Sequence, residues 1–195
     1  QVDYVDLSFE SPANYDYDYI LMSPSTAQAV QAYGIADAVR SPRTKVILGG
    51  PHVTMLPREA LAHADVVFAG EGEETVREFL RDEASGGAGG LYRCLSPPSL
   101  ELTPVPRYEL AARYPYRSVP VQLSRSCPHQ CRFCLSSTIY GKWIRRKSPD
   151  QIRAELEVIR SLWARPFLFF TDDNLFINDA FSRTLVSILE QHPVD

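Results

Sequence analysis

Short apolar segments that each end in small or polar residues recur between residues 19 and 73, and this pattern constrains the fold most strongly. Residues 19–22, 45–48 and 65–69 have the length and composition of buried strands, and helical patterns over residues 27–39 and 58–63 lie between them. Strands that alternate with helices predict a parallel sheet of the α/β class. The carboxyl ends of parallel strands share one edge, which is where ligands bind in such sheets.

The residues that follow these predicted strands form the first set of candidate binding residues. Glycine lacks a Cβ atom, so Gly49 and Gly50 permit a close approach between ligand and backbone. We interpret His52 as a turn or pocket residue. The complete set, strand by strand, comprises Ser23, Ser25, Thr26, Gly49, Gly50, Pro51, His52, Gly70, Glu71, Gly72 and Glu73.

Glycine and proline divide the chain near its middle. Residues 84–90 are rich in glycine, and a proline-rich stretch follows up to residue 117. This composition predicts a linker over residues 84–117, between a first domain at residues 1–83 and a second at residues 118–195.

Strand and helix patterns restart after the predicted linker. Residues 119–124 predict a strand, and the apolar run at residues 166–170 predicts a strand buried on both faces. Between them, Ser148 is expected to cap a helix that begins at Pro149, and a further helix is expected from about residue 179. Strand, helix and strand together predict one βαβ unit.

Three cysteines follow the first strand of this unit with a distinctive spacing. Cys127, Cys131 and Cys134 could supply three thiolates to a cluster of four irons, which leaves one iron open for substrate or cofactor. A zinc site that adds His129 to the same sulfurs is an alternative, as is a redox pair made by the last two cysteines. The clustering argues against a disulfide framework and indicates a reducing compartment.

The CxxxCxxC spacing, with Phe133 directly before the last cysteine, resembles the motif of radical S-adenosylmethionine enzymes. The resemblance implies that Cys127, Cys131 and Cys134 bind a [4Fe-4S] cluster whose open iron chelates S-adenosylmethionine. It also implies that Phe133 lies near the adenine and that reductive cleavage of the cofactor yields a 5′-deoxyadenosyl radical.

Two carboxylates and an amide stand at the end of the second predicted strand. Asp172, Asp173 and Asn174 follow the apolar run directly, at the edge expected to face the cysteines. A simple turn that caps the following loop is the alternative. In radical S-adenosylmethionine enzymes the corresponding strand end contacts the cofactor's ammonium group, so the resemblance makes all three residues candidates for cofactor binding.

The first domain resembles the cobalamin-binding domain that precedes many radical S-adenosylmethionine domains, on the Gly-Gly-Pro-His and Gly-Glu-Gly-Glu segments. The resemblance places cobalamin against the strand-end residues named above. No Asp-x-His-x-x-Gly motif occurs. Either the cobalt has no histidine ligand from the protein, or the domain has lost the cofactor. The first residues resemble the second strand of this domain, so we expect it to be N-terminally incomplete.

The second half resembles hopanoid methylases and related enzymes. The expected fold is therefore a Rossmann-like parallel sheet of the cobalamin-binding type, followed by the truncated start of a partial (β/α) barrel of the radical S-adenosylmethionine type. The expected activity is cobalamin-dependent methyl transfer to an unactivated carbon. Radical cyclisation or rearrangement is an alternative, as is a non-catalytic module that binds a cofactor or zinc.

Charge and hydropathy bear on partners and location. The net charge of −4 disfavours nucleic acid as the main partner. We expect a small-molecule or lipid substrate and a reductant such as ferredoxin or flavodoxin. No apolar run has the length of a transmembrane segment, and no signal peptide is evident, so we expect a cytoplasmic location.

Overall fold

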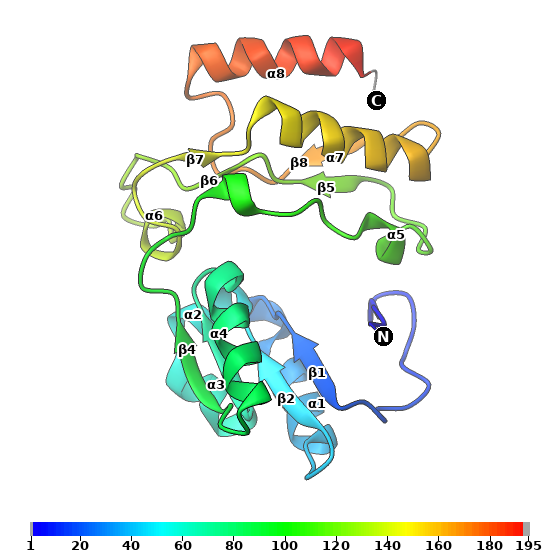
Figure 1. Cartoon of the computed structure of the whole chain (residues 1–195), viewed down its shortest axis with the longest axis vertical. Helices are drawn as coiled ribbons and strands as arrows, with labels where there is room; N and C mark the ends of the chain where they lie inside the picture. Colours follow the sequence, from blue (N-terminus) through cyan, green and yellow to red (C-terminus); the bar gives the residue numbers. More distant parts are fainter. Residues whose placement is uncertain (1, 193–195) are drawn as a thin grey trace. The chain divides into compact units, whose positions relative to one another are not determined.

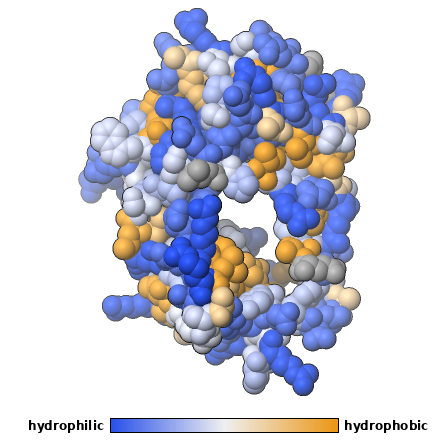
Figure 2. Space-filling model, in the orientation of Figure 1, coloured by the Kyte–Doolittle hydropathy of each residue, from blue (hydrophilic) through white to orange (hydrophobic). Residues whose placement is uncertain are grey.

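The computed structural model describes residues 2–192 and divides into two compact units. The sheet unit comprises Ala13–Pro98. The cysteine-loop unit comprises Gln1–Pro12 and Ser99–Asp195, of which residues 2–12 and 99–192 are described. On the face shown in Figure 2, hydrophilic residues cover most of the surface of each unit.

The sheet unit is a parallel four-stranded sheet with helices on both faces (Figure 1). The strands lie in chain order, and the predicted strands are confirmed with their boundaries within one residue. The strands are β1 (Tyr19–Met22), β2 (Lys45–Leu48), β3 (Val66–Ala69) and β4 (Gly90–Arg93). The helices are η1 (Thr26–Gln28), α1 (Ala29–Val39), α2 (Gly50–Met55), α3 (Pro57–His63) and α4 (Gly72–Ala84).

Alternation along the strands splits the core of the sheet unit into two layers. Val46 and Leu48 pack with α1 and α3 on one face, whereas Ile47 packs with Phe68 and with Phe79 of α4 on the other. Burial on both faces explains why β2 and β3 are continuous apolar runs rather than alternating ones.

Residues 84–117 hold more regular structure than a linker composition suggests. They contain β4, which is an edge strand paired only with β3, then η2 (Leu100–Leu102) and α5 (Tyr108–Ala111). The glycines that suggest a linker form the turn between α4 and β4, where Gly86 and Gly90 have φ of 76° and 75°. A short edge strand with three of its four residues exposed carries almost no hydrophobic pattern.

The cysteine-loop unit contains the predicted βαβ arrangement. Parallel strands β5 (Val119–Val121) and β8 (Leu168–Phe170) pair directly, and β6 (Ser124–Arg125) pairs with β7 (Arg145–Arg146) in antiparallel fashion. The single strand expected at residues 119–124 is thus divided into two. The helices of this unit are α5, α6 (Ser136–Ile139), α7 (Pro149–Leu162) and α8 (Asp179–Gln191).

The predicted helix starts are confirmed. Ser148 Oγ accepts from the Gln151 backbone N–H at 3.2 Å, and the Ser148 backbone N–H donates to Gln151 Oε1 at 2.9 Å, which completes a capping box. Asn178 Oδ1 likewise accepts from the Phe181 backbone N–H at the start of α8.

Helices α7 and α8 cover one face of the β5–β8 pair. Val119, Val121 and Leu168 join Ile159 of α7 and Leu185 of α8 in one core cluster. The expectation that the run at residues 166–170 is buried on both faces is wrong. Phe167 and Phe169 are 56% and 57% exposed, because the described residues place no helix over the opposite face.

The first residues of the chain belong structurally to the cysteine-loop unit. The phenol of Tyr114 accepts from the backbone N–H of Asp6 at 3.0 Å, and the ring of Phe9 stacks on Tyr114 at 5.5 Å between centroids. Tyr4 and Tyr116 share a hydrogen bond between their hydroxyls at 3.1 Å. Residues 2–10 therefore pack against residues 113–116.

Candidate functional site

The three predicted strand-end loops of the sheet unit meet at one edge. The Gly49 backbone N–H donates to Met22 O at 3.0 Å, which joins the first two loops. Thr54 Oγ1 donates to Gly50 O at 2.8 Å and accepts from the Gly70 backbone N–H at 2.9 Å, which joins the second and third. Sequence reasoning missed Thr54, although a threonine four residues after a strand-end glycine is a recognisable signal.

Two glycines in this edge cannot be replaced without strain. Gly50 has φ of 90°, and a Cβ atom there would lie 2.3 Å from Ser23 Oγ. Gly70 has φ of 96°, and its Cβ would lie 2.8 Å from Cys94 Cβ. Both glycines therefore let neighbouring segments of this edge pack in close contact.

We expect Gly50→Ala to destabilise the sheet unit by about 1–3 kcal/mol, because alanine is strained in the left-handed region and meets Ser23. Gly34→Ala is the matched control: Gly34 lies inside α1 with nothing within 4 Å of its added Cβ, and about 0.5–1 kcal/mol of stabilisation is expected. Urea unfolding followed by circular dichroism measures both. Equal changes in the free energy of unfolding for the two substitutions would contradict the conclusion that position 50 requires glycine.

His52 is a buried residue of this edge with both ring nitrogens engaged. Nδ1 lies 3.2 Å from Thr26 Oγ1 and Nε2 lies 3.3 Å from Glu59 Oε1, and the side chain is 7% exposed. The ring thus links the first loop to α3. This geometry accords with a pocket residue, since a metal ligand needs one ring nitrogen directed at the metal.

The remaining predicted residues of the edge lie at helix starts. Ser25 is the N-cap of η1, and its backbone N–H donates to Gln28 Oε1 at 3.0 Å. Pro51 lies in the first turn of α2. Glu71 is buried at the N-cap of α4, and Gly72 and Glu73 begin that helix, so their backbone amides stand at a helix N-terminus.

The cysteine loop connects β6 to α6. Cys127 is partly buried, Cys131 and Cys134 are exposed, and all three are free thiols. Phe133 is 91% exposed. Across residues 2–192 no group of three or more His, Cys, Asp or Glu side chains lies close enough to hold a metal. The structure therefore places the three cysteines on one loop but does not gather their sulfurs.

The entrance to the loop is held rigidly. Ser126 is completely buried, has φ of 80° and donates through Oγ to the backbone oxygen of Gly141. A serine in the left-handed region is uncommon and is kept there by its surroundings. The residue before Cys127 is thus fixed, whereas the two later cysteines lie on an exposed part of the loop.

Residues 172–174 follow β8 and reach three successive parts of the cysteine-loop region. Asp172 accepts from the backbone N–H groups of Leu123 and Ser124 and from Ser124 Oγ. Asp173 Oδ2 accepts from Ser136 Oγ at 2.6 Å at the start of α6, and Asn174 Nδ2 donates to Cys127 Sγ at 3.8 Å. The structure thus brings these predicted residues to the cysteines, and it adds two serines that the sequence analysis missed.

Burial raises the pKa of Asp172 above the ordinary range of an aspartate, even though its hydrogen bonds to Ser124 and Leu123 act in the opposite direction. The folded state therefore binds a proton more tightly than the unfolded state, so the contribution of Asp172 to stability falls as pH rises from about 4 through its raised pKa. We expect the stability of Asp172→Asn relative to the parent chain to increase over that interval. Urea unfolding between pH 3 and pH 7 tests this, and a relative stability that decreases with pH would contradict it.

The sheet unit matches a known domain family. Residues 9–80 match the family model described as the B12 binding domain, and this range contains β1, β2, β3 and all three strand-end loops. Over this range the chain is similar to B12-binding domains.

Most of the chain is similar to named methyltransferases. It is 31% identical over 193 residues to bacteriochlorophyllide d C-8(2)-methyltransferase of Chlorobaculum tepidum, covering 91% of this chain and 43% of that protein. It is 30% identical over 165 residues to hopanoid C-2 methylase of Rhodopseudomonas palustris, covering 83% and 31% respectively. The expected resemblance to hopanoid methylases is thereby confirmed. The chain spans less than half the length of these relatives.

A solved structure shares the fold. The cobalamin-dependent S-adenosylmethionine radical enzyme OxsB, with aqua-cobalamin and S-adenosylmethionine bound, aligns with a TM-score of 0.69 at 16% identity, covering 90% of this chain and 28% of that one. The α/β fold expected from the sequence, a Rossmann-like sheet followed by a βαβ unit, is confirmed.

Proposed function

We propose that the chain is part of a radical S-adenosylmethionine methyltransferase that uses cobalamin. The observation that carries the proposal is the presence, in one chain, of a B12-binding domain and a three-cysteine loop at the carboxyl end of a parallel βαβ unit. The carboxyl edge of parallel strands is where such folds bind ligands. The similarity to methyltransferases supports methyl transfer as the reaction class.

The residues of the cysteine loop have the donor chemistry for an iron–sulfur cluster. Cys127, Cys131 and Cys134 would ligate a [4Fe-4S] cluster, which when bound supplies the electron that cleaves S-adenosylmethionine. Asn174 already donates to the Cys127 sulfur, and an N–H group at that sulfur would stabilise the charge of a ligating thiolate.

The two aspartates that follow β8, Asp172 and Asp173, would have different roles. Both carboxylate oxygens of Asp172 accept from the backbone at Leu123, so this residue would hold the end of β5 in place. Asp173 is more exposed and is held by a single serine hydroxyl, which leaves acceptor capacity for the ammonium group of S-adenosylmethionine.

The edge of the sheet unit would hold cobalamin. Ser23, Ser25 and Thr26 would contact its nucleotide tail, and Gly49 and Gly50 would lie behind it. The left-handed backbone at Gly50 and Gly70 lets the loops of this edge pack closely on Ser23 and Cys94, which would give a large cofactor a firm surface.

Partners and location follow from this chemistry. The substrate would be a small molecule or lipid, and a ferredoxin or flavodoxin would supply electrons. A cytoplasmic location would keep the cluster reduced. None of the described helices has the length and apolar character needed to cross a membrane.

Anaerobic reconstitution tests the proposal. The longest available form of the protein is incubated with iron, sulfide and hydroxocobalamin, desalted, and assayed for iron, acid-labile sulfide, cobalamin and 5′-deoxyadenosine after addition of dithionite and S-adenosylmethionine. Four irons per chain together with 5′-deoxyadenosine are expected. Zinc in place of iron, with no 5′-deoxyadenosine from the longest form of the protein, would overturn the proposal. Transfer of a labelled methyl group would separate methylation from cyclisation or rearrangement.

A further inference from the structure

Glu59 lies outside the strand-end loops of the sheet unit but is connected to them through His52. Its Oε1 atom is 3.3 Å from Nε2 of His52, and the other ring nitrogen, Nδ1, is 3.2 Å from Oγ1 of Thr26. The three side chains, called the Glu59–His52–Thr26 relay below, therefore connect α3 to η1 through α2. Thr26 and His52 belong to the edge proposed for cobalamin, whereas Glu59 has no role assigned so far.

The relay has one buried member between two exposed ones. The side chain of His52 is 7% exposed and that of Glu59 is 50% exposed, and Thr26 is exposed at the edge of the sheet. The imidazole ring packs next to Tyr33 of α1, with 6.0 Å between the ring centroids. Packing thus fixes the orientation of the ring, and both of its nitrogens face side chains of the protein.

The carboxylate of Glu59 determines which nitrogen of His52 carries the proton. An ionised carboxylate only accepts hydrogen bonds, and a neutral imidazole has one N–H donor and one acceptor nitrogen. The contact with Glu59 therefore requires the proton at Nε2 and leaves Nδ1 as an acceptor. The hydroxyl of Thr26 must then donate its proton to Nδ1.

Tyr33 is the other titratable group beside the relay. Burial first, and then the neighbouring carboxylate of Glu59, raises the pKa of Tyr33 to about 12. The phenol therefore stays protonated and uncharged at neutral pH. Glu59 is thus the group that places negative charge next to the ring of His52.

The direction of the Thr26 hydroxyl has a consequence for ligand binding. A threonine hydroxyl has one donor and two acceptor lone pairs. Because the donor is directed at His52, the exposed oxygen of Thr26 offers only acceptor capacity to a ligand. An N–H or O–H group of a ligand would be complementary to it, whereas a phosphate oxygen would meet a second acceptor and gain no hydrogen bond.

We propose that Glu59 is a positioning residue that holds His52 in its Nε2–H form and thereby makes Thr26 an acceptor for a hydrogen-bond donor of the bound ligand. Under the proposed function, on which the identity of the ligand rests, that donor is an N–H or O–H group of cobalamin, and the phosphate of cobalamin lies elsewhere. The relay is present in the free chain, so the role of Glu59 is measurable without a ligand.

Long-range ¹H–¹⁵N correlation spectra test the role of Glu59, because they distinguish the two neutral forms of histidine and the doubly protonated form. At about pH 8, where an ordinary histidine is neutral, we expect the Nε2–H form of His52. Glu59→Lys replaces the acceptor by a donor and is expected to shift His52 toward the Nδ1–H form. Glu78→Lys makes the same change of charge on the exposed side of α4 and is expected to leave His52 unchanged.

Two spectroscopic results would overturn the role of Glu59. One is an Nδ1–H or doubly protonated His52 in the parent chain. The other is an unchanged form of His52 in Glu59→Lys, since the carboxylate would then not be what holds the proton at Nε2.

Binding of hydroxocobalamin tests the role of Thr26. Thr26→Val keeps the side-chain shape but removes the hydroxyl, and is expected to weaken binding about threefold to tenfold, which corresponds to one hydrogen bond. Thr26→Ser retains the hydroxyl and is expected to bind like the parent chain. Glu59→Lys is expected to weaken binding relative to Glu78→Lys, and the combination of Glu59→Lys with Thr26→Val is expected to be no weaker than Thr26→Val alone, because both substitutions act on one hydroxyl.

The two measurements separate failure of the relay from failure of the proposed function. Unchanged affinity in Thr26→Val, or additive losses in the combined variant, would overturn the role of Thr26 whatever the form of His52. If the parent chain showed the expected forms of His52 but bound no hydroxocobalamin, the role of Glu59 would stand and the cobalamin site itself would be contradicted.

Discussion

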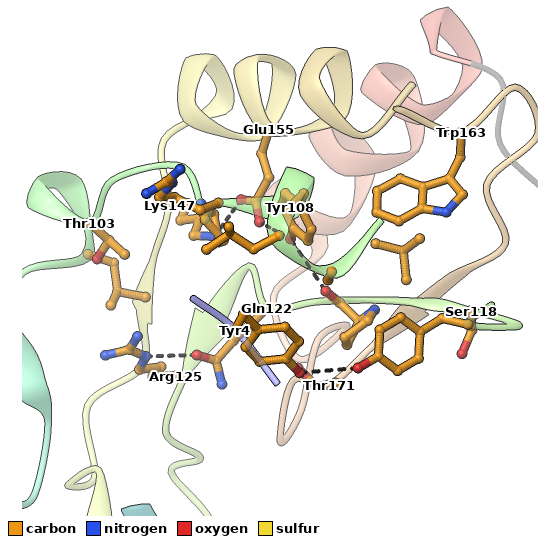
Figure 3. A pocket seen from close by; sticks show the side chains of 18 residues that line it. Tyr4, Thr103, Tyr108, Ser118, Gln122, Arg125, Lys147, Glu155, Trp163 and Thr171 are labelled. Atoms are coloured by element: carbon orange, nitrogen blue, oxygen red, sulfur yellow. Dashed lines mark hydrogen bonds and ion pairs between the residues drawn. The ribbon is translucent and has the colours of Figure 1, made fainter. Parts of the chain in front are cut away.

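Glu155→Leu is expected to destabilise the cysteine-loop unit by about 3–5 kcal/mol, because it leaves the buried ammonium of Lys147 without its counter-ion. The substitution also removes the closer of two acceptors for the buried hydroxyl of Tyr108, which keeps only Pro120 O at 3.3 Å. Figure 3 shows Lys147, Glu155 and Tyr108 together in the wall of a cavity of this unit. Urea unfolding monitored by tryptophan fluorescence measures the change, since both tryptophans lie in this unit.

Two companion variants make the Glu155 experiment specific. Lys147→Met combined with Glu155→Leu is expected to recover most of the lost stability, because the pair is then replaced by apolar groups of similar size. Glu157 lies on the exposed side of the same helix, so Glu157→Leu is the control. It is expected to change the free energy of unfolding by less than about 0.5 kcal/mol. A double variant as unstable as Glu155→Leu alone would show that the ion pair is not the source of the effect.

Loss of any one of Cys127, Cys131 or Cys134 is expected to abolish cluster assembly. Alanine at one position would leave two thiolates, which is too few to retain four irons during desalting. Iron and sulfide per chain, together with the absorbance near 400 nm after anaerobic reconstitution, measure the effect. The expected result is near-complete loss of iron in each single variant.

Cys94→Ala is the internal control for the cysteine variants. Cys94 follows β4 in the sheet unit, and its thiol donates to Ser96 O at 3.2 Å, so its removal is expected to leave the iron content unchanged. His129→Ala distinguishes an iron–sulfur cluster from a zinc site, since only a zinc site would need the imidazole as its fourth ligand. Dependence of metal content on His129 would favour zinc and contradict the cluster assignment.

Local patterns were sufficient to predict most elements of both units. The apolar runs at β1, β2 and β3 gave the strands nearly to the residue, and the Ser-Pro-Asp-Gln sequence gave the start of α7. These features depend on interactions within a few residues, such as capping and side-chain alternation, which a sequence displays directly.

The elements that were missed depend on partners distant in the sequence. Strand β4 is defined by pairing with β3, and its own residues are mostly exposed. The exposure of Phe169 follows from which helices cover the β5–β8 pair, which no local pattern encodes. Both are properties of tertiary packing that override the local signal.

The same distinction applies to the candidate sites. The sequence identified residues at strand ends, because strand ends are local features. It could not distinguish the carboxylate of Asp172, which has several hydrogen bonds, from that of Asp173, since the difference arises from residues 37 or more positions away in the chain. It also gave no indication that Tyr108, Lys147 and Glu155 would meet in one buried cluster.

The contacts of residues 172–174 have a consequence for the order in which the protein matures. Asn174 reaches Cys127 across 47 positions of the chain, and Asp172 reaches Ser124 across 48. These contacts form only after β8 has paired with β5, since that pairing brings the tripeptide to the loop. During synthesis, the cysteines therefore emerge from the ribosome well before their supporting residues. Under the proposed function, iron delivered at that stage would meet an unsupported loop, so insertion of the proposed cluster is expected to follow completion of the strand pair.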